Sequence, residues 1–137
     1  MAGEVFVDTG VWYAAASPAV AEHEASSGAL RRAIAERAAI VSTNLVVAET
    51  HALLLTRVNR AVALAFVRAV TRPPNRIVHS SPEIEARAVT DWLERYDDQG
   101  FSFCDAVSFA VMRERKIGDA LSLDRHFRTA GFRVRPT

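Results

Sequence analysis

Short apolar runs alternate along this chain with longer segments that carry apolar residues at helical spacing. The first run, Val5-Phe6-Val7, combines β-branched and aromatic residues, which is the composition of a strand buried on both faces. Later runs of the same kind lie at residues 39–42, 76–79 and 120–123, with a short edge strand at 132–134. Strands that alternate with helices form a parallel sheet with helices on both faces. The sequence therefore predicts an α/β fold around a parallel sheet of four to five short strands.

Residues that cap a first turn mark the expected helix starts. Ser17-Pro18 and Ser81-Pro82 each place a hydroxyl before a proline, which is typical of a helix that begins at the proline. Thr43 or Asn44 is placed to cap the helix that follows, and Asn59 the one after it. Ser102 stands three residues before Asp105, close to the pattern of a capping box. We expect a short helix at residues 12–16 and longer ones at 18–38, 45–58, 60–72, 82–96, 103–116 and 125–130.

The composition indicates one globular domain spanning residues 1–137, since 50% of the residues are hydrophobic and 24% are charged. The net charge of +1 gives no overall indication of nucleic-acid binding. Sixteen of the 17 basic residues are arginine, but 24 alanines accompany them, and we interpret both as a genome-wide compositional habit. The lone Cys104 excludes an internal disulfide and a cysteine-based zinc site, which fits a reducing compartment. With no signal-type segment and no apolar run near the ~20 residues that span a bilayer, we expect a cytoplasmic protein.

Four acidic residues are candidates for a site at the carboxyl ends of the strands, where α/β folds bind their ligands. Asp8 and Asp124 each follow an apolar run, and a parallel sheet brings such positions to the edge where ligands bind. Asp105 lies in the first turn of an expected helix. Glu49 shares a helical face with apolar residues of the 45–58 helix, so we expect it to point toward the core. An unpaired carboxylate is unfavourable there unless it is protonated, paired or bound to a metal.

Each acid also has a purely structural alternative. Asp8 and Asp124 are placed to cap a following helix, Asp105 already belongs to a capping box, and Glu49 is free to pair with an arginine across the core. The four together favour a metal site, because crowded carboxylates stay ionised only when a cation balances them. Oxygen ligands alone favour Mg²⁺ or Mn²⁺ over zinc. Such ions activate water and brace an in-line displacement at phosphorus, which is nuclease chemistry.

The segments that carry these acids resemble the PIN-domain signature. They are Asp8-Thr9-Gly10 after a hydrophobic run, Glu49 in a long helix, Ser102-Phe103-Cys104-Asp105-Ala106, and Leu121-Ser122-Leu123-Asp124-Arg125-His126-Phe127. The resemblance covers essentially the whole chain and is closest to the VapC-type toxins of bacterial toxin–antitoxin pairs. Position 122 is serine where the family often has threonine, so the hydroxyl is kept.

This resemblance implies a PIN-like three-layer α/β/α domain that acts as a Mg²⁺- or Mn²⁺-dependent endoribonuclease and as the toxin of such a pair. It also implies a homodimer and a small antitoxin that covers the acidic cleft. Carried over by position, the expected catalytic and metal-binding acids are Asp8, Glu49, Asp105 and Asp124, of which Asp124 is the least regularly required in the family. Thr9 matches a hydroxyl that supports a metal-bound water, and Ser102 matches the hydroxyl that opens the helix.

The expected mechanism is hydrolysis of an RNA phosphodiester by a metal-activated water. Asp8 and Asp105 are expected as the principal ligands, Glu49 as the residue that orients a water or acts as base, and Asp124 as a residue that completes the shell or holds a second ion.

Residues beside these acids have weaker indications. Arg125 and Arg128 flank the expected site and are candidates for contact with substrate phosphates. His126 is expected to pack or to cap a helix, and Cys104 to be a small core residue.

Two other functions stay open. One is a PIN-like scaffold that binds RNA or a partner without catalysis, which predicts that some of the four acids are missing; all four are present. The other is a PIN nuclease in RNA processing that is not a toxin. A short reading frame immediately upstream, encoding a DNA-binding head and a helical tail, would favour the toxin.

Overall fold

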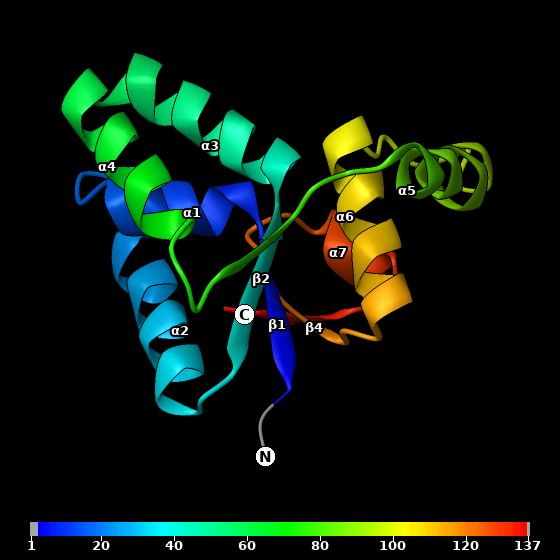
Figure 1. Ribbon diagram of the computed structural model, residues 1–137, viewed down its shortest axis with the longest axis horizontal. Coiled ribbons are helices and arrows are strands. Elements are labelled where there is room, and N and C mark those ends of the chain that lie inside the picture. The colour runs from blue at the N-terminus through cyan, green and yellow to red at the C-terminus, as the bar shows by residue number, and fades with distance from the viewer. Residues whose placement is uncertain (1–2, 137) are drawn as a thin grey trace.

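The computed structural model describes residues 3–136, and its strands form one five-stranded sheet in which every strand pair is parallel (Figure 1). The strand order is β3-β2-β1-β4-β5, so the first strand of the chain lies at the centre. The strands are β1 (Glu4–Val7), β2 (Ala39–Thr43), β3 (Arg76–Val78), β4 (Asp119–Leu121) and β5 (Arg133–Arg135). The predicted parallel sheet is confirmed, including the edge strand near the carboxyl end.

Helices cover both faces of this sheet, which confirms the predicted three-layer α/β/α arrangement (Figure 1). One face carries α1 (Thr9–Ala16) and α2 (His23–Ala35). The other carries α5 (Pro82–Arg87), the π-helix η1 (Ala88–Glu94), α6 (Phe103–Arg115) and α7 (His126–Thr129). Among residues 3–136, no helix is long and apolar enough to cross a membrane.

The alternation of side chains along β1 explains why helices are needed on both sides. Val5 and Val7 pack toward α1 and α2, whereas Phe6 packs into the opposite core, where its ring lies 6.0 Å from that of Phe127. All three side chains are almost fully buried. β1 takes the central position of the sheet, where helices cover both of its faces.

The helices α3 (Asn44–Arg57) and α4 (Arg60–Val70) pack against each other and project from the α1 side of the molecule (Figure 1). They share a small apolar cluster that includes Leu54, Phe66 and Val70. The indole of Trp12 in α1 lies edge-on to Phe66 of α4 at 5.9 Å. This contact packs the α3–α4 pair against the rest of the domain.

Three of the expected helix caps are confirmed. The side-chain oxygens of Thr43, Asn59 and Ser81 accept hydrogen bonds from the backbone N–H three residues further on, at 3.2, 2.8 and 3.2 Å. Each of these residues satisfies one of the N–H groups that a first helical turn leaves without a partner.

The helix start expected at Ser17-Pro18 is wrong. Residues 17–22 form turns, and α2 begins only at His23, whose Nδ1 donates to the carbonyl of Ala14 at 2.8 Å. The chain must reverse here so that α2 can pack against α1, and a helix that began at Pro18 would carry it away. From His23 the helix continues through Gly28 without interruption.

Two other elements differ from the expectation. The helix that starts at Pro82 changes to π-helical turns after Arg87. The strand expected at residues 120–123 ends at Leu121. Beyond it, Ser122 still donates its backbone N–H to Arg135, but its side chain turns toward Asp8. Asp124 therefore lies in a loop three residues beyond the strand, not at its end.

Candidate acidic active site

Asp8 lies at the carboxyl end of the central strand. Its backbone N–H donates to the carbonyl of Leu121 at 3.0 Å, which extends the pairing between β1 and β4 by one step. Only 6% of its surface is exposed, and its Oδ2 accepts a hydrogen bond from the hydroxyl of Ser122 at 3.2 Å. Although Asp8 precedes α1, its side chain makes no capping hydrogen bond to that helix. The carboxylate is therefore directed to the sheet edge, and the capping alternative does not apply.

The environment of Asp8 disfavours its charge. Burial raises the pKa of this carboxyl from 3.8 to about 7, and the nearby charges of Asp105 and Asp124 also raise it. Hydrogen bonds from the Thr9 N–H and the Ser122 hydroxyl act in the opposite direction. A buried carboxylate beside two others is the situation in which a bound cation stabilises the ionised form.

Asp105 serves the local structure and the cleft together. It occupies the first turn of α6, where the Ser102 hydroxyl accepts from the Asp105 N–H at 3.0 Å and Asp105 Oδ2 accepts from the Ser102 N–H at 3.1 Å. This confirms the predicted capping box. The same Oδ2 lies 3.2 Å from Nδ1 of His126. The amino end of α6 favours negative charge at this point, because the helix dipole is positive there.

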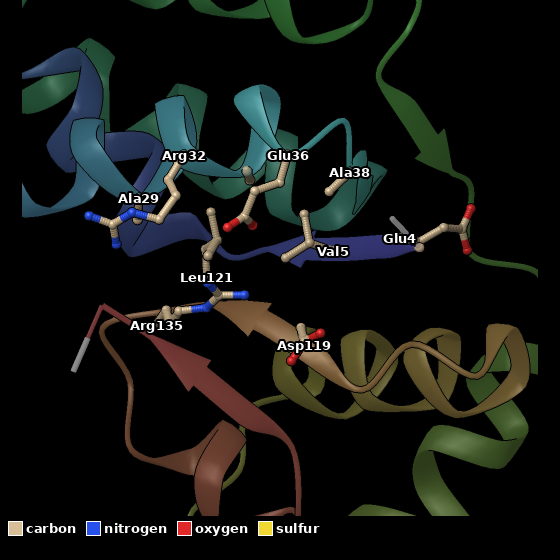
Figure 2. Close-up of a pocket in the computed structure, with 11 residues that line it drawn as sticks. Glu4, Val5, Ala29, Arg32, Glu36, Ala38, Asp119, Leu121 and Arg135 are labelled. Atoms are coloured by element: carbon tan, nitrogen blue, oxygen red, sulfur yellow. The ribbon is translucent and has the colours of Figure 1, made fainter. Parts of the chain in front are cut away.

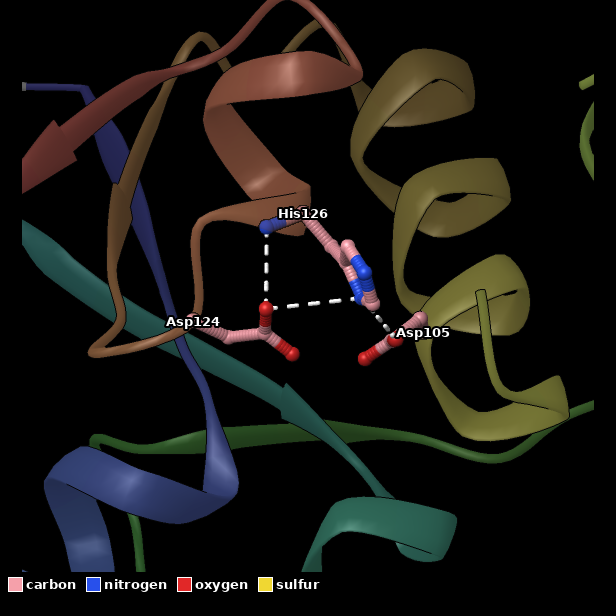
Figure 3. A group of neighbouring side chains, drawn as sticks. All are labelled: Asp105, Asp124 and His126. Atoms are coloured by element: carbon pink, nitrogen blue, oxygen red, sulfur yellow. Dashed lines mark hydrogen bonds and ion pairs between the residues drawn. The ribbon is translucent and has the colours of Figure 1, made fainter. Parts of the chain in front are cut away.

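His126 bridges two of the acids (Figure 3). Its Nδ1 lies 3.2 Å from Asp105 Oδ2 and 3.4 Å from Asp124 Oδ1, and its backbone N–H donates to the same Asp124 oxygen at 2.9 Å. Its ring also lies edge-on to Phe101 at 5.2 Å. The expected packing role is thus present, and the bridge between the acids adds to it.

Asp105, Asp124 and His126 place one ligand atom each within 4.8 Å of one another. Three such atoms at this separation have the spacing of a metal-binding group. The histidine in this group was not expected from the sequence, because His126 forms no sequence pair with another histidine. The only sequence signal was its position two residues after Asp124.

Glu49 does not point into the core, so that expectation is wrong. Helix α3 buries the stripe Val46, Thr50 and Leu54, and Glu49 lies off this stripe and is exposed. It nevertheless lines the same cleft as Asp8 and Asp105. It does so because α3 begins directly after β2 at the carboxyl edge of the sheet, which brings its second turn beside the cleft.

The cleft has a volume of about 460 Å³ and is open to solvent. Its lining residues are Asp8, Thr9, Gly10, Glu49, Gly100, Ser102, Asp105, Leu123, Asp124 and His126. The structure thus brings together the four predicted acids and both predicted hydroxyl residues. Arg125 and Arg128 are exposed and are not among these lining residues.

Thr9 supplies an independent indication that the cleft holds a polar ligand. Its hydroxyl oxygen is buried, yet it has no hydrogen-bond partner within residues 3–136. Buried polar groups are normally paired, so an unpaired one on a cleft wall favours a water or an ion as the missing partner. The hydroxyl and the carboxylates form an all-oxygen donor set, and this fits Mg²⁺ or Mn²⁺.

The thiol of Cys104 is also affected by the negative charges of the cleft. Burial raises the pKa of its thiol, and the charges of Glu49, Asp8 and Asp105 raise it further. The amino end of α6 therefore does not activate this thiol.

A second cavity, of about 190 Å³, lies on the α2 face of the sheet (Figure 2). Val5 and Leu121 lie on its sheet side, and charged residues of both signs, including Arg32, Glu36 and Arg135, surround it. None of the four predicted acids lines it. The acidic cleft is therefore the candidate active site.

Comparison with known protein families matches residues 5–133 to the PIN domain. Among curated proteins, the 23S rRNA-specific endonuclease VapC20 of Mycobacterium tuberculosis is 37% identical over 134 residues, which cover 96% of this chain and 98% of the relative. Its crystal structure, described as that of a sarcin-ricin loop cleaving toxin, superposes with a TM-score of 0.84 at 34% identity, over 94% of this chain and 96% of that chain.

Two more distant structures share the fold. VapBC2 from Rickettsia felis, bound to a DNA fragment from its promoter, has a TM-score of 0.69 at 11% identity over 95% of this chain and 96% of that chain. FitAcB from Neisseria gonorrhoeae has a TM-score of 0.66 at 16% identity over 95% of both chains. At these identities the two matches support the fold alone.

Proposed function

The chain belongs to the PIN-domain family, and we propose from this premise that it is a metal-dependent endoribonuclease that acts as the toxin of a toxin–antitoxin pair. The proposal rests chiefly on one observation: Asp8, Glu49, Asp105 and Asp124, which are far apart in the sequence, line a single cleft. The 37% identity to an RNA endonuclease over almost the whole chain supports it. We treat residues 1–137 as one catalytic domain.

The proposed cofactor is Mg²⁺ or Mn²⁺, and the fit rests on the carboxylate oxygens of the cleft and the unpaired hydroxyl of Thr9. Such an ion supplies activation of a water and neutralisation of charge at the scissile phosphate. Asp8 and Asp105 are the proposed principal ligands, with Asp124 completing the set. The unfavourable burial of the Asp8 charge would be offset by a bound ion, which would also balance the neighbouring carboxylates of Asp105 and Asp124.

The remaining residues position these groups or move protons. Glu49 stands exposed on the cleft wall, where a carboxylate oxygen can orient the attacking water and accept its proton. Ser102 holds Asp105 through the paired hydrogen bonds of the capping box. His126 fixes the positions of the Asp105 and Asp124 carboxylates relative to each other by contacting both. Arg125, which precedes α7, and Arg128, which lies within it, are exposed and are proposed to contact substrate phosphates outside the cleft.

Ribosomal RNA is the proposed substrate class. The relative from Mycobacterium tuberculosis is named a 23S rRNA-specific endonuclease, and this chain covers 98% of its length. A small antitoxin that covers the acidic cleft is the proposed protein partner, and the 34% identity to a structure described as that of a toxin supports such a partner. A homodimer and a cytoplasmic location are parts of the same proposal.

The test is cleavage of purified ribosomal RNA, with the cut mapped by primer extension. We expect cleavage that requires Mg²⁺ or Mn²⁺, stops with EDTA and falls at least 100-fold in Asp8→Asn and in Asp105→Asn. The matched control is Asp98→Asn, which removes an exposed carboxylate that does not line the cleft.

Metal-dependent cleavage that survives in Asp8→Asn would overturn the assigned site. A wild-type protein that binds RNA without metal and cuts no RNA would instead indicate the non-catalytic scaffold. Cleavage without growth inhibition on expression would favour an RNA-processing nuclease over a toxin.

A further inference from the structure

Positive charge is concentrated in one stretch of this chain. Residues 50–82 contain five arginines and no acidic residue, whereas the rest of the chain has 12 basic and 16 acidic residues. The near-neutral total therefore conceals a strongly basic segment within a chain that is otherwise acidic. The arginines of this stretch are Arg57, Arg60, Arg68, Arg72 and Arg76, and we name them the arginine face.

All five arginines of this face are exposed. They lie at the end of α3, along α4, in the turn after α4 and at the start of β3. None of them takes part in the ion pairs found among residues 3–136, and Arg57 alone has an aromatic contact, at 5.6 Å from the ring of Tyr13. Elsewhere Arg87, Arg115 and Arg133 are each paired with a carboxylate.

Helix α4 presents two of the arginines together. Its buried stripe is Ala63, Phe66 and Val70, so Arg60 and Arg68 lie on the outward side, eight residues or about 12 Å apart along the axis. The other outward positions are mainly alanines, at 61, 65 and 69. Small side chains between the arginines allow a broad ligand to approach the helix closely.

The arginine face lies one helix away from the acidic cleft. Helix α4 packs against α3, and α3 carries Glu49 on the cleft wall (Figure 1). Packed helices have axes roughly 8–10 Å apart. The exposed residues of α3 beside Glu49 include Ala48 and Ala52, which are small and uncharged. A polyanion that leaves the cleft across α3 therefore meets no carboxylate beyond Glu49 before it reaches α4.

We propose that the arginine face binds the phosphate backbone of the RNA outside the segment that is cut. This inference rests on the proposed nuclease function and adds a second point of attachment for the substrate. A cleft lined by four acids repels RNA, and the net charge of +1 provides no general attraction. Affinity for a polyanion must then come from a local concentration of cations, because phosphate contacts dominate affinity for nucleic acids.

RNA is a better occupant of this face than an acidic protein. Guanidinium groups pair with phosphate oxygens through two hydrogen bonds. Protein interfaces are usually centred on buried aromatic or large apolar anchors. The outward side of α4 offers only Leu64, which is 38% exposed, and no aromatic residue. Leu55 and Val58 beside Arg57 are 46% and 37% exposed, but the arginine face has no exposed aromatic residue. The surface thus has the cations of a backbone-binding site and lacks the aromatic anchor of a protein interface.

The first experiment measures binding of a labelled hairpin RNA of ribosomal sequence by fluorescence anisotropy at several salt concentrations. Arg60→Gln/Arg68→Gln is introduced into Asp8→Asn protein, so that no RNA is cut. We expect the affinity to fall about tenfold and the slope of log K against log[salt] to decrease by about 1.5, since each lost phosphate contact contributes roughly 0.7–0.9. The matched control, Arg31→Gln/Arg95→Gln, removes two exposed arginines outside the basic stretch and should leave the slope unchanged.

The second experiment uses active enzyme with two substrates. On the hairpin RNA, Arg60→Gln/Arg68→Gln should raise KM about tenfold and leave kcat unchanged, because these residues hold substrate without contacting the reacting atoms. On a short oligonucleotide that spans only the cut, the variant and the wild type should have equal kcat/KM.

Equal salt slopes for the α4 pair and the control pair would overturn the inference. Unchanged RNA binding together with lost copurification of a co-expressed antitoxin would overturn it as well, since the face would then belong to a protein partner. Failure of the nuclease proposal has a separate signature, namely a wild-type protein that cuts no RNA in the presence of Mg²⁺ or Mn²⁺.

Discussion

Burial of Asp8 works against the stability of the metal-free protein. Its carboxyl has a pKa of 3.8 when solvated and about 7 in the fold, chiefly because of burial. The folded state therefore binds this proton more tightly than the unfolded state does. The resulting stabilisation is complete below about pH 4 and is lost as the pH rises through 7. Near neutral pH, the buried ionised carboxylate lowers the stability of the fold, and a bound cation would offset this loss.

Asp8→Asn should therefore stabilise the metal-free protein at neutral pH. A shift of this size corresponds to about 4 kcal/mol lost by the wild type between pH 4 and pH 8, and the variant should lack this loss. The measurement is urea unfolding in EDTA at pH 4.5 and pH 7.5 for both proteins. Asp98→Asn, which changes an exposed carboxylate, should follow the wild type. Parallel pH dependence of Asp8→Asn and wild type would contradict the assigned environment.

At the scale of elements, the amino end of α6 combines a helix cap with a site residue. Ser102 caps α6 as Ser81 caps α5, and each hydroxyl accepts from the backbone N–H three residues on. The two caps differ in their surroundings, because only Ser102 lines the acidic cleft and is bonded to one of its acids. A matched pair of substitutions therefore separates stability from activity.

Ser102→Ala and Ser81→Ala should each lower the free energy of unfolding by about 1 kcal/mol, the usual effect of losing an N-cap. Only Ser102→Ala should also reduce kcat for RNA cleavage, because the backbone N–H of Asp105 loses its partner and the first turn that positions the Asp105 carboxylate is loosened. The hydrogen bond from the Ser102 N–H to that carboxylate is kept in the variant. Denaturant unfolding and single-turnover cleavage provide the two measurements. An equal loss of kcat in Ser81→Ala would show that activity follows helix stability in general.

At the scale of the whole molecule, the two elements that carry the buried acids are joined again at their far ends. β1 leads to Asp8, and Asp105 lies in the first turn of α6. At the opposite ends of these elements, Arg115 donates to Glu4 through Nε at 3.1 Å and through a second nitrogen, Nη2. The pair is partly exposed, so its contribution is modest, but it links residues 111 positions apart.

A double-mutant cycle with Glu4→Gln and Arg115→Gln should give a coupling free energy of about 0.5–1 kcal/mol, the range for a partly exposed pair with two hydrogen bonds. Thermal or denaturant unfolding of the four proteins provides it. The same cycle on Arg87 and Glu114, a more exposed pair with one hydrogen bond, should give a smaller value. A larger coupling for the exposed pair would contradict the proposed role of the Glu4–Arg115 pair.

The sequence by itself determined the features that depend on a few neighbouring residues. The buried run 5–7, the caps at Asn59 and Ser102 and the alternation of strands with helices were enough to predict the parallel sheet. Local patterns also placed Asp8 beyond a strand and Asp105 in a first helical turn. These predictions succeed because strand burial and helix capping are governed by side chains within about four positions of one another.

Only the tertiary structure decided which faces of these elements meet. Glu49 was expected in the core but is exposed on the cleft wall, and Ser17 was expected to start a helix but lies in a turn. The contact of His126 with two acids and the position of α4 one helix away from the cleft both depend on how separate helices pack. Helical periodicity specifies that one face of a helix is apolar. Contacts between residues distant in the chain decide which element covers that face and which charged residues remain exposed beside it.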